Sequence, residues 1–142
     1  MEEAKPSESV VHLLHRAAQA ADGLFMRNIR GLTPRQLEVL KAVSVSDGTS
    51  QIAISAITGI DRSSTASLVG KLVRAGFLVR KRKPGDKRTN VVRLTANGEY
   101  AVRRNLAKAE RVDAELLAPL SQAERSKLLA LLRRFSDLHQ SE

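Results

Sequence analysis

The stretch TSQIAISAITGIDRSSTASLVGKLVRAGFLVRKRKPGDKRTNVVRLT, residues 49–95, decides the fold. It opens with hydroxyl residues ahead of an apolar run, which is a helix N-cap signal, and Gly59 closes this first short helix. Asp61 follows after only one further residue and caps a second helix, residues 61–75, which Gly76 ends. Two short helices joined by a glycine-containing turn predict a helix-turn-helix.

A β-hairpin is predicted directly after these helices, at residues 77–94. Two β-rich runs, residues 77–82 and 89–94, flank the segment KPGDKR, whose Pro-Gly pair is typical of a turn. A β-ribbon that follows a helix-turn-helix makes a winged helix. We therefore expect a mainly α, α+β fold whose winged helix-turn-helix lobe, residues 33–95, binds DNA.

Amphipathic helices are predicted on both sides of this lobe, within a single domain that spans residues 1–142. Apolar residues recur every three to four positions in residues 10–30 and 96–140, and Ser121 with Glu124 forms a capping box inside the second range. A winged-helix core needs only about 60 to 80 residues, so in a monomer these flanking helices would expose apolar faces. We expect them to form a homodimer, and packing as an intramolecular bundle is the alternative. The predicted dimer contacts are Val11, Leu14, Leu128, Leu131, Phe135 and Leu138.

The formal charge of +9 is concentrated in one segment. Residues 62–93 contain ten basic side chains and a single acid, Asp86, whereas the other 110 residues carry 14 basic and 14 acidic side chains. A cationic segment on an otherwise neutral chain indicates a polyanionic partner, and the helix-turn-helix makes double-stranded DNA the expected one.

The composition disfavours several other classes of protein. The absence of Cys excludes disulfide scaffolds, Cys-ligated zinc and thiol redox sensing, and we expect no metal and no cofactor. No apolar run is long enough to span a membrane, so we expect a cytoplasmic, nucleoid-associated protein. The few aromatic residues argue against readers of single strands. No catalytic motif is present, and a small nuclease that uses His12 with Glu8 or Asp22 is the remote alternative.

The helix over residues 61–75 is the predicted recognition helix. Its solvent-exposed face combines short hydroxyl side chains, which allow a close approach to bases, with cations that attract phosphates. An ordinary surface helix with a polar outer face is the alternative interpretation. The predicted contacts are Arg62, Ser63, Ser64, Ser67, Lys71 and Arg74.

The hairpin supplies the second predicted DNA contact, through Lys83, Asp86, Lys87 and Arg88. Asp86 and Arg88 are two residues apart, so the carboxylate can orient the guanidinium, and an oriented Arg on a narrow ribbon suits the minor groove. Lysines on strand edges also occur merely to prevent aggregation, but that alternative does not account for an Arg beside a lone acid.

These residues together resemble the MarR family of bacterial transcriptional regulators. The resemblance lies in GIDRSS at residues 59–64, GFLVR at 76–80, Asp86-Lys87-Arg88 and the Leu-Thr-x-x-Gly motif at 94–98. It implies an obligate homodimer on a pseudo-palindromic operator, and repression relieved by a small effector such as an aromatic or phenolic acid or an acyl-CoA-like compound. Carried over by position, Ser63, Ser64, Ser67 and Lys71 would face the major groove, and Arg88 would enter the minor groove.

Two positions depart from the family pattern. Where many members carry a basic recognition residue this chain has Ser67, and Gly70 stands at a common acidic position.

The resemblance also implies an effector pocket between the dimer helices and the lobe. We consider His15, Arg16 and Asp22 as its lining, with a merely solvated helix face as the alternative. A DNA-binding protein without a ligand, or controlled by a partner, is the alternative function. Binding to a membrane surface is disfavoured because the cations lie on the hairpin rather than on the amphipathic helices.

Overall fold

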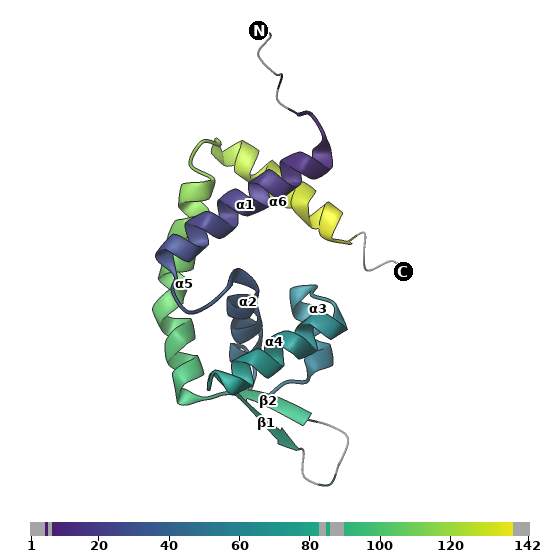
Figure 1. The fold of residues 1–142 in the computed structure, drawn as a ribbon, viewed down its shortest axis with the longest axis vertical. Helices are drawn as coiled ribbons and strands as arrows, with labels where there is room; N and C mark the ends of the chain where they lie inside the picture. Colours follow the sequence, from purple (N-terminus) through teal and green to yellow (C-terminus); the bar gives the residue numbers. More distant parts are fainter. Residues whose placement is uncertain (1–4, 6, 83–84, 86–89, 138–142) are drawn as a thin grey trace.

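The computed structural model describes residues 5, 7–82, 85 and 90–137, and in this part of the chain six helices accompany a two-stranded sheet, which lies at the end of the molecule opposite α1 and α6 (Figure 1). The elements in order are α1 (Val10–Asn28), α2 (Pro34–Ser44), α3 (Gln51–Thr58), α4 (Arg62–Arg74), β1 (Leu78–Arg82), β2 (Asn90–Leu94), α5 (Ala96–Leu116) and α6 (Gln122–Ser136). The predicted winged helix-turn-helix is therefore confirmed.

Side-chain caps set where the helices begin, as the sequence predicts. Thr33 and Ser121 each accept a hydrogen bond from the backbone N–H three residues later, and Gln36 and Glu124 complete both capping boxes by accepting from the cap N–H. Ser50, rather than its neighbour Thr49, caps α3. Because these caps are local, the sequence alone locates the helix starts to within a residue or two.

The core sits around α2, which packs against α3, α4, α5 and β2. The side chains that fill it come from all of these elements and from β1. They include Leu37, Leu40, Val43, Ile54, Val69, Leu72, Leu78, Val92 and Val102. The C-terminal part of α1 joins this core through Phe25, and α1 runs along α5. The helix-turn-helix is thus held on its inner side by a continuous apolar cluster.

The hairpin is antiparallel, with its register running from Leu78 opposite Leu94 to Arg82 opposite Asn90. Thr49, in the connection between α2 and α3, pairs with Val92 through two backbone hydrogen bonds of 3.0 and 2.7 Å. The sheet is therefore tied to the start of α3 as well as to the end of α4.

The flanking helices leave much of their apolar surface uncovered. Val11, Leu14, Leu131 and Phe135 are 66, 42, 39 and 50% exposed, and Leu128 is half-buried. The described part of α6 contributes no buried residue, so the core of the single chain does not cover the apolar face of this helix. Leu138 lies outside the described residues. The dimer itself stays a prediction, now supported by these exposed side chains.

The 3–4 spacing of apolar residues predicts a buried stripe on α5 at Val102, Leu106, Ala109, Val112 and Leu116, and the structure differs from it at one position. Leu106 is 40% exposed, whereas Asn105 is buried and donates from Nδ2 to the Ala101 carbonyl at 2.8 Å. No helix in the described ranges is long and apolar enough to cross a membrane.

Candidate nucleic-acid interface

The turn between α3 and α4 is fixed by hydroxyl side chains. The carbonyl of Ile60 accepts hydrogen bonds from the hydroxyls of Ser55 and of Thr65, the latter at 3.3 Å. Thr58 Oγ1 accepts from the Ile60 N–H at 3.2 Å and donates to the Ile54 carbonyl at 2.8 Å. Because Thr65 is fully buried, this network sets the angle between the two helices from inside the lobe.

Asp61 organises the first turn of α4. Its carboxylate accepts from the Ser64 N–H and from the Ser64 hydroxyl, both at 2.8 Å. These hydrogen bonds lower the pKa of Asp61 below its ordinary value, with the one from the Ser64 N–H contributing most. The Ser64 hydroxyl hydrogen is used internally, which leaves its oxygen as an acceptor for a partner. Arg62 and Ser63 are exposed beside it.

The outer face of α4 carries the polar residues that the sequence predicts for it. Thr65, Val69 and Leu72 point into the core, whereas Ser67, Lys71 and Arg74 are exposed. The orientation of the helix is thus confirmed, and the roles of these side chains in binding DNA stay predictions.

Two guanidinium groups converge above Gly70. A Cβ atom built on Gly70 would lie 3.4 Å from Arg74 Nη1 and 3.8 Å from Arg80 Nη2. Arg80 reaches this position from β1 and donates to Gln51 Oε1, at the start of α3, at 3.4 Å. Across the described ranges, neither Arg has a carboxylate within 4.0 Å. Two elements, α4 and β1, therefore present one cation each above Gly70, and Gln51 at the start of α3 holds the one from β1.

The exposed hairpin adds further cations next to this cluster. Lys81 and Arg82 are exposed, and Arg93 Nη1 lies 3.8 Å from Asp47 Oδ1. Arg93 is therefore partly neutralised by an acid from outside the basic segment, which the charge pattern alone does not reveal. The predicted wing contacts Lys83, Asp86, Lys87 and Arg88 lie outside the described residues.

Thr95 and Gly98 join the winged-helix lobe to α5. Thr95 donates its hydroxyl to the Gly76 carbonyl at 2.6 Å, and its N–H donates to the Phe77 carbonyl at 3.0 Å. The Thr95 hydroxyl oxygen also caps α5 by accepting from the Gly98 N–H at 3.1 Å. A Cβ on Gly98 would lie 2.1 Å from the Phe77 carbonyl oxygen, so only glycine permits this approach. The Leu-Thr-x-x-Gly motif is thus a structural joint.

Comparison with known proteins identifies the family to which this chain belongs. The family model described as MarR family matches residues 30–89. A transcriptional regulatory protein named for the hcr operon of Thauera aromatica is 35% identical over 124 residues, which cover 85% of this chain and 75% of that protein. The chain belongs to the MarR family.

Two solved structures carry the same fold over nearly the whole length. BpsR of Bordetella bronchiseptica, studied for the regulation of its DNA binding by 6-hydroxynicotinic acid, has a TM-score of 0.84 and 30% identity over 96% of this chain and 99% of its own. The transcriptional repressor CouR bound to a 23-mer DNA duplex has a TM-score of 0.82 and 28% identity over 95% of this chain and 99% of its own.

The predicted effector residues of this MarR-family chain do not all meet at one place. Asp22 lines a cleft of about 340 Å³ between α1, α2 and α5, together with Phe25, Arg35 and Lys41. His15 and Arg16 are exposed on α1 and do not line this cleft. The sequence does not indicate Arg35 and Lys41 as lining residues. Both belong to α2, which the sequence assigns to the DNA-binding lobe, and only the fold brings them to the cleft. No group of three or more His, Asp or Glu side chains that would suit a metal ion occurs within the described ranges.

Proposed function

We propose that this chain is a homodimeric transcriptional repressor that binds a pseudo-palindromic double-stranded operator and releases it when a small organic acid binds. The observation that carries the proposal is the separation of two surfaces. The cations gather on α4 and the hairpin, and exposed apolar side chains gather on α1 and α6, at the other end of the molecule (Figure 1). One end suits DNA and the other suits a second copy.

The mode of DNA binding follows from the exposed face of α4. Arg62, Ser63, Ser67 and Lys71 would meet the major groove, with Ser64 accepting through its oxygen, while Arg74 meets a phosphate. The wing contacts Lys83, Asp86, Lys87 and Arg88 are proposed from the sequence, with Arg88 in the minor groove. CouR, whose solved structure holds a 23-mer DNA duplex, supports double-stranded DNA as the partner.

Dimerisation would bury the apolar stripes of residues 10–30 and 96–140. Two-fold pairing through Val11, Leu14, Leu128, Leu131, Phe135 and Leu138 places two α4 helices about 34 Å apart, one turn of DNA. The predicted operator is therefore an inverted repeat with half-sites one helical turn apart.

The effector would bind in the cleft that Asp22 lines, because Arg35 offers a cation to a carboxylate and Phe25 offers an apolar wall. Lys41 also lines the cleft but is paired with Glu38 at 2.9 Å, and Asp113 is a third acid in the lining, so we assign the carboxylate to Arg35 alone. BpsR, whose DNA binding is regulated by 6-hydroxynicotinic acid, supports an aromatic acid as the ligand class. His15 and Arg16 would join the site only if the second copy brings them close. We propose that the protein acts on the DNA of the nucleoid, in the cytoplasm. We propose no enzymatic reaction for it.

The DNA proposal is tested by sequencing the genomic fragments that the purified protein retains, followed by anisotropy titrations on the enriched site. We expect an inverted repeat, and Lys71→Ala should weaken binding by about 1–3 kcal/mol if it reads a base. Lys127→Ala, on α6 away from the cationic surface, is the matched control and should leave the affinity unchanged. Random fragments, or equal losses in both variants, would refute the assignment.

The dimer proposal is tested by sedimentation. Leu131→Glu should convert the dimer to a monomer, because it buries a charge in the proposed apolar interface, whereas Lys127→Glu should leave the dimer intact. A wild-type monomer at micromolar concentration would contradict the proposal.

The effector proposal is tested by thermal shift. 6-Hydroxynicotinic acid, related aromatic acids and their CoA thioesters should raise Tm and weaken DNA binding, and Arg35→Ala should reduce both effects. A screen with no stabilisation and no release would favour a DNA-binding protein that works without a ligand.

A further inference from the structure

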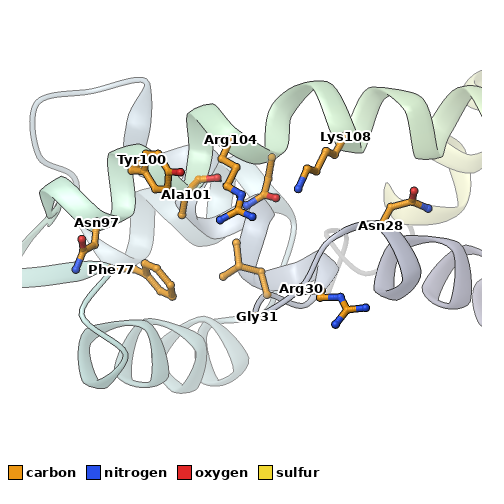
Figure 2. Close-up of a pocket in the computed structure, with 11 residues that line it drawn as sticks. Asn28, Arg30, Gly31, Phe77, Asn97, Tyr100, Ala101, Arg104 and Lys108 are labelled. Carbon is orange, nitrogen blue, oxygen red and sulfur yellow. Dashed lines mark hydrogen bonds between the residues drawn. The ribbon is translucent and has the colours of Figure 1, made fainter.

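A second cleft, of about 470 Å³, lies between the connection of α1 with α2 and the first half of α5 (Figure 2). One face of α5 contributes residues 97, 100, 101, 104, 105 and 108. The opposite wall is formed by Asn28, Arg30, Gly31 and Leu32, and Phe77 closes one end. The cleft shares no lining residue with the one that Asp22 lines.

The charge of this cleft is unbalanced. Arg30, Arg104 and Lys108 line it, and no Asp or Glu does. In the part of the chain that the structure describes, no carboxylate lies within 4.0 Å of these three cations. All three belong to the 110 residues that sum to zero charge, so the excess is local to the cleft. In Figure 2 the side chains of Arg104 and Lys108 extend from α5 toward the connection.

The remaining lining combines aromatic rings with carboxamides. Tyr100 is 57% exposed and Phe77 is half-buried, so both rings offer surface to a planar ligand. Asn28 and Asn105 each donate from Nδ2 to a helix carbonyl at 2.8 Å. Their carboxamide oxygens are left as acceptors, and Asn105 is one of only two buried polar residues in the described ranges.

We propose that this cleft binds an aromatic polyanion, a planar ring that carries phosphate groups. Arg104 and Lys108 extend from α5 over the cleft, and Arg30 adds a third positive charge at the opposite wall, although its side chain points away from α5 (Figure 2). Together they exceed the charge of a single carboxylate, and Arg and Lys bind phosphate oxygens through charge-assisted hydrogen bonds. The ring would pack on Tyr100 and Phe77. The volume falls within the range of small-molecule sites. Free nucleotides and the adenosine phosphate part of coenzyme A share this chemistry. Because the site lies outside the DNA-reading surface, it does not depend on the proposed repressor function.

The test uses ADP as the probe and two independent readouts on the full chain. Calorimetry should detect ADP binding more tightly than adenosine, pyrophosphate or benzoate, each of which lacks part of the required chemistry. Tyr100 is the sole tyrosine in a chain without Trp, so its fluorescence reports on this cleft alone. ADP should change that fluorescence over the same concentration range. Coenzyme A, run in parallel, identifies which source of the shared group binds more tightly.

Variants locate the site. Arg104→Ala should weaken ADP binding about tenfold or more, and Tyr100→Ala about fivefold or more, while both exposed positions leave folding intact. The matched control is Arg103→Ala, an exposed Arg on α5 that does not line the cleft. Equal losses in Arg103→Ala and Arg104→Ala, binding without a change in Tyr100 fluorescence, or ADP no tighter than pyrophosphate would each overturn the proposal.

Discussion

Gly70→Glu tests the cationic cluster on α4 directly. The new side chain would start 3.4 Å from Arg74 Nη1 and 3.8 Å from Arg80 Nη2, so its carboxylate can pair with either guanidinium. Glycine also weakens a helix interior relative to most residues, by up to about 1 kcal/mol, so the variant should be at least as stable as the parent. A loss of DNA binding would therefore arise from charge at the interface and not from unfolding.

The magnitude follows from counterion release. Each phosphate contact contributes about 0.9 to the steepness with which log K, the logarithm of the binding constant, falls with the logarithm of the salt concentration. At about 0.15 M salt, one contact therefore raises log K by about 0.7 compared with its value at 1 M salt. One neutralised cation in each of two protomers should lower the slope by about 2 and weaken binding roughly 30-fold, or by about 2 kcal/mol.

Anisotropy titrations over a range of salt concentrations measure both quantities, and thermal unfolding checks the fold. Gly23→Glu is the control, because it makes the same change on α1, where a built Cβ has no neighbour within 4 Å. A slope unchanged by Gly70→Glu, or an equal effect of Gly23→Glu, would show that Arg74 and Arg80 do not contact DNA phosphates.

Arg88→Ala should weaken operator binding by about 1–3 kcal/mol in a gel-shift titration, and an unchanged affinity would rule out the wing assignment. Gly98→Ala should lower the free energy of unfolding by about 1–3 kcal/mol in urea, because its Cβ would lie 2.1 Å from the Phe77 carbonyl oxygen, whereas Gly23→Ala should not destabilise. The pKa of Asp61 is lowered by hydrogen bonds at the helix cap, so its stabilising effect is present above the ordinary pKa of about 4 and disappears as pH falls through the lowered value. Asp61→Asn keeps a capping oxygen and should flatten the loss of stability on acidification; an acid profile identical to that of the parent would contradict this account.

The sequence predicts the local features of this fold well, because caps and turns depend on neighbours along the chain. Thr33, Ser121 and Gly59 mark helix ends that the structure confirms. The sequence does not reveal contacts between residues that are far apart along the chain. The pairing of Thr49 with Val92, the hydrogen bond from Thr95 to Gly76 and the exposure of Leu106 depend on how distant segments meet.

The candidate sites divide in the same way. The outer face of α4 follows from helical periodicity, so its residues can be named from the sequence. Arg30 and Arg104 are far apart in the sequence and line one cleft only because the connection after α1 passes beside α5. Likewise, the position of Arg80 above Gly70 requires β1 to fold back along α4.

Thr95 and Gly98 anchor the first turn of α5 to the winged-helix lobe, and the rest of the helix extends away from this fixed end. Its 21 residues span about 31 Å at 1.5 Å per residue, and its first turn is fastened to the end of α4 through the carbonyls of Gly76 and Phe77. A tilt of about 5° between α5 and the lobe then displaces the far end of the helix by about 3 Å. If α5 moves as a rigid body, a shift of about 3 Å where α5 meets α6 corresponds to a rotation of the winged-helix lobe by about 5°, which is the geometric coupling that the proposed regulation would use.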